Sequence, residues 1–487
     1  MPRLSIPAAG RDREALVAEM QTMREGDARW REGRTWSMVY YGGDAHHETV
    51  RQANNLFLDD NALNPVAFKS LKKMEAQVVA MTASMLNGPP STVGTMTSGG
   101  TESILMAVKT ARDRARAKRP WIRRPELVAP RTLHVAFDKA CHYFGLRARY
   151  TDVDDNGQAI VPAIERAITR NTVLIAASAP QYITGTIDPI PEIGALAARR
   201  GIPFHVDACF GGFILPWLER IGVALPVFDF RVDGVTSMSA DVHKYGFSPK
   251  GASVVLYRDM SHLRHQFYVR TDWPGGIYIS PSMQGSRPGG AIAAAWASLM
   301  AMGEDGFVER AREAMEIADR LRAGVSMIPG LSVRGLPHSP VVTYGSDDPA
   351  VDLYAVADQL EARGWSVDRQ QDPPTIHLTV NTTNAPTVDP YLRDLRAAVE
   401  HVRAHPELAR AGDAAVYGMM ARVPLKGLVR QGVVKIMEQM YAPGVEAVTL
   451  DDVQDDSLTG RLMEKYGDRI LDAVDAVRAR LPGRRGR

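Results

Sequence analysis

The sequence predicts an α/β protein in which helices cover both faces of a mostly parallel sheet, followed by a smaller α+β domain. The first observation is a series of short runs rich in Val, Ile and Ala that alternate with helical stretches, as buried parallel strands do. These runs lie at 133–137, 172–179, 203–208, 234–240 and 253–259. The second observation is a change near 306, where a long helix leads into shorter strands separated by Asp- and Ala-rich helical pieces.

The segments before the first run also have readable patterns. Residues 11–31 are polar with helical spacing, and the stretch WSMVYYGG at 36–43 breaks into extended, Gly-terminated chain. An amphipathic helix is expected over 65–87, and a second begins within TSGGTES at 97–103, where a hydroxyl residue precedes Glu102.

These patterns divide the chain into three expected parts. The N-terminal arm covers 1–60, the large domain 61–324 and the small C-terminal domain 325–487. In open α/β sheets, ligands bind outside the carboxyl ends of the strands. We therefore expect the functional residues directly after the apolar runs.

Composition excludes several classes of function. The chain has 487 residues, and 58 basic against 56 acidic residues leave a net charge of +2, too small for a broad field that would hold nucleic acid. The basic end at 481–487 is interpreted as a solvated terminus. No apolar run approaches the roughly 20 residues of a transmembrane helix, and the N-terminus lacks an export signal. With only 2 cysteines, we expect a reducing compartment, the cytoplasm.

Two stretches carry the most specific chemistry. In SADVHKYGFSPKGASVVLY a strand runs into His243 and Lys244, which places the lysine at the mouth of a cleft. In HVDACFGGF, Asp207 ends an apolar strand, where a buried carboxylate needs a cationic partner. The protonated pyridine nitrogen of pyridoxal 5'-phosphate (PLP) is such a partner, and the pairing keeps the ring able to accept electrons.

A phosphate site and a stacking residue complete the pattern. TSGGTES at 97–103 begins a helix, whose free N–H groups and dipole favour a phosphate dianion. It matches neither of the common nucleotide-phosphate motifs. His134 is a candidate to stack on an aromatic cofactor ring, although it also fits an ordinary strand position.

In their order and contexts, these residues resemble the group II PLP-dependent decarboxylase family, of the PLP-dependent transferase fold type I. The resemblance covers nearly the whole chain, and within the family it is greatest to the sphingosine-1-phosphate lyases. It rests on VYYGG, KMEAQ, TSGGTESILMA, SADVHKYGFSPKG and TDWPGGIYISPSMQGSRPGG.

The resemblance implies a role for each matching residue. Lys244 would carry PLP as an imine, Asp207 would pair with its pyridine nitrogen and His134 would stack on its ring. The residues implied to touch the cofactor phosphate are Gly100, Thr101 and His243. Those implied to hold a substrate phosphate are Tyr40, Lys250 and Ser286. Tyr182 follows the strand at 172–179 and is a candidate proton-transfer group.

The chain departs from this pattern at one position of interest. Where the lyases have Asn-Pro-Leu-His, this chain has NALN, so Asn64 replaces a histidine implied to contact the substrate phosphate. Asparagine donates a hydrogen bond but carries no charge. Arg287 is interpreted as fixing a loop that closes a neighbouring subunit's site, so a homodimer with shared active sites is expected.

Three functional hypotheses follow. The first is a PLP-dependent carbon–carbon lyase that cleaves sphingosine 1-phosphate, or a similar phosphorylated long-chain 2-amino alcohol, to a fatty aldehyde and phosphoethanolamine. The alternative is an L-amino-acid decarboxylase, which needs a site for a carboxylate instead of a phosphate. The third is an inactive scaffold, which the joint presence of Lys244, Asp207 and His134 disfavours. No metal is expected, because the adjacent His46 and His47 lack the spacing of a ligand pair.

Overall fold

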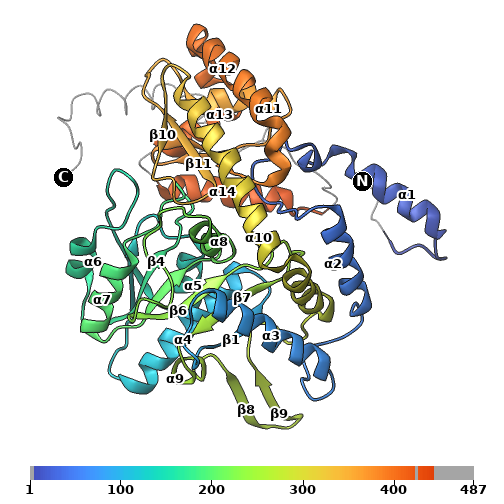
Figure 1. Ribbon diagram of the computed structural model, residues 1–487, viewed down its shortest axis with the longest axis vertical. Coiled ribbons are helices and arrows are strands. Elements are labelled where there is room, and N and C mark those ends of the chain that lie inside the picture. Colours follow the sequence, from blue (N-terminus) through green and yellow to red (C-terminus); the bar gives the residue numbers. More distant parts are fainter. Residues whose placement is uncertain (1–4, 423–425, 444–487) are drawn as a thin grey trace.

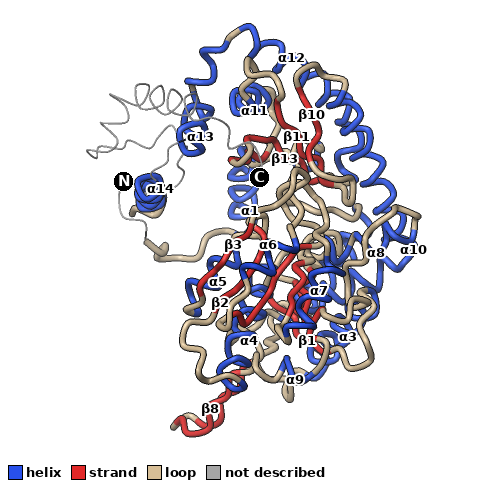
Figure 2. Tube along the Cα trace, turned by 90° about the vertical axis from the view of Figure 1, so that its left-hand side faces the viewer, coloured by secondary structure: helices blue, strands red, loops and turns tan. Residues whose placement is uncertain are grey.

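A seven-stranded sheet forms the centre of the computed structural model, which describes residues 5–422 and 426–443 (Figures 1 and 2). The strand order is β1-β7-β6-β5-β4-β2-β3. Strand β7 runs antiparallel to both of its neighbours, and the remaining neighbours pair in parallel. The bounds are β1 Val93–Thr97, β2 Glu126–Pro130, β3 Arg147–Thr151, β4 Thr172–Ser178, β5 Phe204–Asp207, β6 Val235–Ala240 and β7 Ser253–Tyr257.

Helices cover both faces of this sheet, as Figure 2 shows for the strands enclosed between them. On one face, apolar residues of α4 and α5 pack against Leu127, Val173 and Leu174 of the sheet. On the other, α3, α7, α8 and α10 pack against alternate residues of the same strands, such as Val128 and Ile175. The helices are α3 Lys69–Met85, α4 Gly100–Lys118, α5 Ala136–Phe144, α6 Val161–Ala167, α7 Ile190–Arg200, α8 Leu215–Arg220, α9 Met260–Leu263 and α10 Gly289–Ser326.

A four-stranded antiparallel sheet of order β10-β11-β13-β12 forms the core of the C-terminal part. Its own apolar cluster includes Trp36, which the N-terminal segment supplies and which packs against Trp365 and Tyr391. The bounds are β10 Leu331–Arg334, β11 Val341–Ser346, β12 Asp368–Gln371, β13 Pro374–Thr379, α11 Leu353–Glu361, α12 Val388–Ala404, α13 Gly412–Arg422 and α14 Lys426–Met440.

The long helix α10 joins the two parts (Figure 1), because its residues belong to both apolar clusters. It bends at Gly303, whose φ of 62° and ψ of 170° are not helical. The remaining elements are α1 Arg13–Met23, α2 Asp44–Leu56, β8 Tyr268–Trp273, β9 Gly276–Ser280 and the 3-10 helices η1 Arg24–Gly26, η2 Trp30–Glu32, η3 Gly211–Phe213, η4 Thr382–Thr387 and η5 Pro406–Arg410. None of the helices within the described residues has the length and apolar character needed to cross a bilayer.

The fold class predicted from the sequence is confirmed, and four of the five apolar runs are strands of the central sheet. The strand expected at 133–137 is wrong, because the chain turns there and enters α5. The amide N–H groups of Ala136 and Phe137 donate to Nδ1 and the carbonyl of His134, respectively, which forms the start of a helix. The neighbouring strand is β2. The domain boundaries at 60 and 324 stay predictions, and the basic end at 481–487 lies outside the described residues.

Candidate active site

A cavity of about 490 Å³ opens at the carboxyl ends of β4, β5 and β6. Ser178, Asp207 and Asp241 lie at or directly after the ends of these strands, and the loop that precedes α4 forms another wall. Nine predicted site residues line the cavity: Tyr40, Gly100, Thr101, His134, Tyr182, Asp207, His243, Lys244 and Lys250.

Lys244 forms an ion pair with the buried Asp241 that the sequence analysis did not assign. Its Nζ lies 3.1 Å from Oδ2 of Asp241, and Nε2 of His243 lies 3.5 Å from the same oxygen. Burial disfavours the ammonium, but the charge of Asp241 outweighs this effect and raises the pKa of Lys244 above its usual range. Burial likewise opposes ionisation of Asp241, yet Lys244 and His243 hold its pKa well below the usual range. Lys244 must therefore release a proton before its amine can react as a nucleophile.

Asp207 is held through one of its two carboxylate oxygens. Its Oδ1 accepts hydrogen bonds from the backbone N–H of Cys209 at 3.0 Å and from Oγ of Ser239 at 3.2 Å. Its Oδ2 has no hydrogen-bond partner within the part of the chain that the structure describes. This oxygen belongs to a carboxylate that lines the cavity, so it is ready to accept from a cationic ligand.

The glycines at the start of α4 are required by close packing. A Cβ atom at Gly100 would lie 2.7 Å from Oδ2 of Asp241 and 2.8 Å from Sγ of Cys209. Glu102 stabilises the same turn, because its Oε2 accepts from the backbone N–H and the hydroxyl of Ser98 at 2.7 and 2.6 Å. The helix thus begins at the cavity with its N–H groups and dipole directed toward a bound anion.

Two aromatic residues lie on the opposite wall. The rings of His134 and Tyr182 meet edge to face, with centroids 6.5 Å apart. The hydroxyl of Tyr182 donates to Oδ2 of Asp368 at 3.1 Å, and its ring stacks on His377 at 4.3 Å. Burial and the charge of Asp368 raise the pKa of Tyr182 above its usual range, so the phenol is neutral at pH 7. Asp368 comes from β12, so the C-terminal part contributes to this wall.

Lys250 and Tyr40 form the polar rim of the cavity. The Lys250 ammonium lies 5.0 Å from the centroid of the Tyr40 ring and donates to the carbonyl of His243 at 3.2 Å. Partial burial and the charge of Lys244 lower the pKa of Lys250 to about 8. Burial raises the pKa of Tyr40 to about 12, although Lys244 opposes the shift. At pH 7 this rim offers one cation and one neutral hydroxyl.

Asn64 and Ser286 lie outside the cavity. Oδ1 of Asn64 accepts from the N–H groups of Val66 and Ala67, and Oγ of Ser286 accepts from Nδ2 of Asn61 at 3.1 Å. Their two segments are joined by Arg287, which donates to both carboxylate oxygens of the buried Glu75 at 2.8 and 3.0 Å and to the carbonyl of Ala62 at 3.3 Å. The structure therefore separates these two predicted substrate residues from Tyr40 and Lys250 of the same chain.

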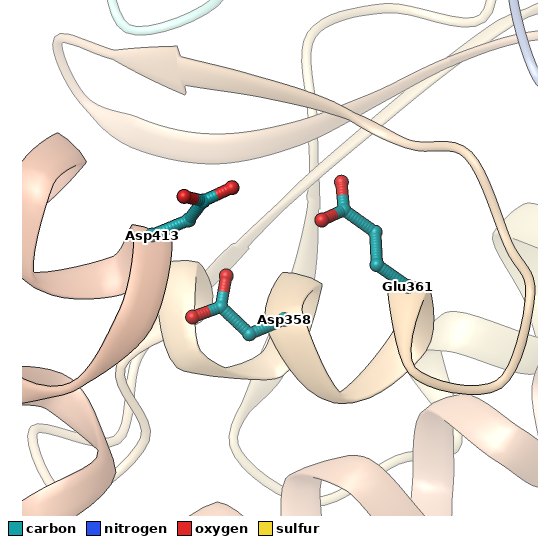
Figure 3. Close-up of side chains that lie close together, drawn as sticks. All are labelled: Asp358, Glu361 and Asp413. Atoms are coloured by element: carbon teal, nitrogen blue, oxygen red, sulfur yellow. The ribbon is translucent and has the colours of Figure 1, made fainter. Parts of the chain in front are cut away.

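A cluster of three carboxylates lies elsewhere, in the C-terminal part (Figure 3): Asp358, Glu361 and Asp413. The guanidinium of Arg369 donates to Asp358 at 2.6 Å and to Glu361 at 2.5 and 2.9 Å. The backbone N–H of Ala414 also donates to Asp358 at 2.9 Å. Since Arg369 already pairs with two of the three carboxylates, the cluster is explained as an ion-pair network that ties β12 to two helices.

Sequence reasoning missed the roles of Asp241 and Asp368. Asp241 lies three residues before Lys244 in the stretch SADVHKYG. This short spacing could have indicated that the two side chains form an ion pair. Asp368 gave no such signal, because the wall it forms depends on how the C-terminal sheet packs against the cavity.

Comparison with known proteins agrees with this geometry. Residues 51–334 match the family described as the pyridoxal-dependent decarboxylase conserved domain. The chain is 42% identical over 444 residues to the sphingosine-1-phosphate lyase of Arabidopsis thaliana, covering 90% of this chain and 81% of the relative. It is 43% identical over 418 residues to sphingosine-1-phosphate lyase 1 of Rattus norvegicus, covering 85% and 73%.

Solved structures show the same likeness. A sphingosine-1-phosphate lyase from Burkholderia pseudomallei superposes with a TM-score of 0.82 at 36% identity, covering 90% of this chain and 97% of that one. The glutamate decarboxylase of Lactobacillus brevis, at 20% identity and a TM-score of 0.73, shares the fold.

Proposed function

Since the chain belongs to the pyridoxal-dependent decarboxylase family and, within it, to the sphingosine-1-phosphate lyases, we propose that it cleaves sphingosine 1-phosphate or a similar phosphorylated long-chain 2-amino alcohol. The products are a fatty aldehyde and phosphoethanolamine, and the cofactor is PLP. The observation that carries the proposal is the identity to these lyases over 90% of the chain. The enzyme is thus a PLP-dependent carbon–carbon lyase.

The residues of the cavity fit this cofactor. The oxygen Oδ2 of Asp207 is available to a protonated pyridine nitrogen, because the two donors to this carboxylate both use Oδ1. Gly100 and Thr101 line the cavity at the start of α4, where the free N–H groups of the helix can receive a phosphate. Lys244 lines the same cavity and supplies the amine that would hold the cofactor covalently.

In the proposed mechanism each residue has a separate task. When bound, PLP supplies an electron sink for the carbanion that remains at C2 after the C2–C3 bond breaks. Asp207 would keep the pyridine nitrogen protonated, and His134 would stack on the ring. Tyr182 relays the proton of the substrate 3-hydroxyl: its oxygen accepts this proton while its own O–H proton passes to Oδ2 of Asp368. Thr101 and His243 support the cofactor phosphate.

The substrate phosphate is assigned to the rim formed by Tyr40 and Lys250. A protonated Lys250 provides the charge that a phosphate monoester dianion requires, and the Tyr40 hydroxyl adds a donor. This pairing favours the lyase over an amino-acid decarboxylase, whose substrate carries no phosphate.

The test incubates PLP-loaded protein with sphingosine 1-phosphate and detects phosphoethanolamine and long-chain aldehyde by mass spectrometry. Product is expected from the wild type and not from Lys244→Ala. Protein that binds PLP but forms no product would reject this substrate class. Release of carbon dioxide from amino acids would then support the decarboxylase.

The proposal includes a homodimer with shared active sites. Asn64 and Ser286 do not line the cavity of their own chain, so contact with a substrate phosphate requires a second copy that presents them. The hairpin of β8 and β9 supports an interface because Trp273, Ile277 and Ile279 are more than half exposed. Both cysteines are buried and free, which is consistent with the cytoplasm as the proposed compartment.

Complementation tests the shared site. A Lys244→Ala chain is mixed, through co-expression, with a chain in which Ser286→Glu repels the substrate phosphate. Heterodimers should contain one intact site, so activity should return to roughly a quarter of the wild-type value. A mixture no more active than its two parents would reject shared sites.

A further inference from the structure

A row of polar side chains lies directly beneath Asp207, inside the central sheet. In the register of β5 and β6, His205 pairs with Ser237 and Asp207 pairs with Ser239. Side chains two residues apart on a strand point to the same face. His205 and Ser239 are fully buried, and Ser237 and Asp207 nearly so. Burying a histidine in this position is costly unless both ring nitrogens have partners.

The hydrogen bonds of this row have a fixed direction. The hydroxyl of Ser239 donates to Oδ1 of Asp207 at 3.2 Å. Because this hydroxyl has a single hydrogen, Nε2 of His205, 3.2 Å from the same Oγ, must be the donor in that contact. On the other side of the ring, Nδ1 of His205 lies 2.9 Å from Oγ of Ser237.

The imidazole is neutral, which fixes its tautomer. Burial lowers the pKa of His205 to about 4, although the charge of Asp207 opposes the shift. A neutral ring with a protonated Nε2 has an unprotonated Nδ1, which accepts from Ser237. All the donors therefore point the same way, from Ser237 through His205 and Ser239 to the carboxylate. Hydrogen bonds aligned in this way in a low-dielectric interior polarise one another.

We infer that His205 and Ser239 are positioning residues that hold Oδ1 of Asp207 in place and leave its Oδ2 directed to the pyridine nitrogen of the cofactor. The inference rests on the proposed function, because that function places PLP in the cavity. Neither residue lines the cavity, so both act on the cofactor through Asp207. In metal sites, removing a residue that hydrogen-bonds to a metal ligand typically lowers the metal affinity about 10- to 100-fold. A loss of PLP affinity on a similar scale is expected here.

The experiment compares holoenzymes of wild type, His205→Leu, His205→Gln and Ser239→Ala. One readout is the dissociation constant for PLP. The other is the ¹⁵N chemical shift of the pyridine nitrogen in protein loaded with ¹⁵N-labelled PLP, which reports its protonation. Thr82→Val is the matched control, since it removes a fully buried hydroxyl that bonds only to the carbonyl of Val78, away from Asp207.

His205→Leu and Ser239→Ala are expected to weaken PLP binding about tenfold and to move the ¹⁵N shift toward that of neutral pyridine. His205→Gln, whose amide can still donate to Ser239, should recover most of both properties. Thr82→Val should change neither property even where it lowers Tm.

Unchanged PLP affinity and ¹⁵N shift in folded Ser239→Ala and His205→Leu would overturn the inference. A loss in His205→Gln as large as that in His205→Leu, with the ¹⁵N shift constant, would also overturn it, because the histidine would then act through packing alone. Wild-type protein that binds no PLP would overturn the proposed function as well, so the two failures are distinguishable.

Discussion

The two halves of the predicted site differ in how the fold places them. The half assigned to the cofactor, represented by Lys244, Asp207 and Gly100, lies around one cavity at the ends of adjacent strands. The half assigned to the substrate phosphate is divided. Tyr40 and Lys250 line the cavity, whereas Asn64 lies outside it, beside an apolar cavity of about 540 Å³ that Leu63 and Pro65 help to line.

This difference separates the predicted site residues that the fold of one chain brings together from those that it keeps apart. A parallel sheet brings the ends of its strands together, so residues far apart in sequence meet at one edge. The segments that carry Asn64 and Ser286 are instead fixed to α3 by the ion pair of Arg287 and Glu75. The residues proposed for the cofactor are therefore assembled within one chain, whereas those proposed for the substrate phosphate meet only in the homodimer that we propose.

The largest effect is expected where the cofactor half is broken. Lys244→Ala removes the amine that we propose to hold PLP, and it should reduce phosphoethanolamine formation by at least about 10³-fold. Borohydride reduction of the wild type followed by intact-mass measurement should show a stable PLP adduct, and the variant should show none. Lys250→Ala is the matched lysine control and should keep the adduct. An adduct on Lys244→Ala would mean that a different lysine holds the cofactor.

The second prediction concerns the segments outside the cavity. Arg287→Met leaves the buried carboxylate of Glu75 with only the more distant ammonium of Lys72, 3.9 Å away, among the described residues. This should lower the free energy of unfolding by about 3–5 kcal/mol. Urea denaturation followed by circular dichroism measures the change. Adding Glu75→Met should recover most of the loss, because an apolar pair buries no charge.

The same ion pair predicts a dependence of stability on pH. Burial disfavours ionised Glu75, but Arg287 outweighs it and holds the pKa of Glu75 below its usual value. The stabilisation by this group is therefore complete above the unfolded pKa, near 4.5, and is lost as pH falls through the lower folded pKa. An equal effect of Arg287→Met at pH 7 and at pH 3 would contradict this explanation.

Much of the central sheet could be predicted from the sequence, because inner strands such as β4 and β7 are rich in apolar residues and alternate with helical stretches. Strand β4 reads TVLIAAS and is buried at every residue. The two edge strands could not, since β1 reads VGTMT and β3 reads RARYT, in which polar residues interrupt the apolar ones. The run at 133–137 misled because LHVAF has the composition of a strand, whereas the backbone there turns into α5.

Within the site, residues carried by motifs could be predicted and residues carried by tertiary packing could not. Lys244 and Asp207 follow apolar runs, and the cavity forms around them. Asp368 comes from a strand of the other sheet and has no local pattern. His205 looks like an ordinary strand residue, and only the pairing of β5 with β6 shows its path to Asp207.

The third prediction tests the part of the phosphate site that lies in the cavity. Lys250, whose pKa is lowered to about 8, is charged below that pH and neutral above it. Because a phosphate monoester becomes a dianion above about pH 6, kcat/KM should be highest between about pH 6 and 8 and should fall as Lys250 loses its proton.

Two variants separate this charge from other ionisations. Lys250→Met should lower kcat/KM at pH 7 by about tenfold and should remove the decline above pH 8. Lys250→Arg keeps the charge at every pH, so it should retain activity at pH 7 and shift the decline upward. A decline near pH 8 that persists in Lys250→Met would assign the ionisation to another group.

The smallest effect is expected at the residue furthest from the cofactor chemistry. If a second copy presents Asn64 to the substrate phosphate, Asn64→His should lower KM by roughly two- to fivefold at pH 6, where the imidazole is largely protonated, and by less at pH 8. Asn64→Gln controls for side-chain size and should show no pH-dependent gain. KM is measured at both pH values to test whether the charge of the histidine is responsible. An equal change in KM at pH 6 and 8 would show that the histidine acts without its charge. An unchanged KM in Asn64→His would place residue 64 outside the shared site, and the phosphate would then depend on Tyr40 and Lys250 alone.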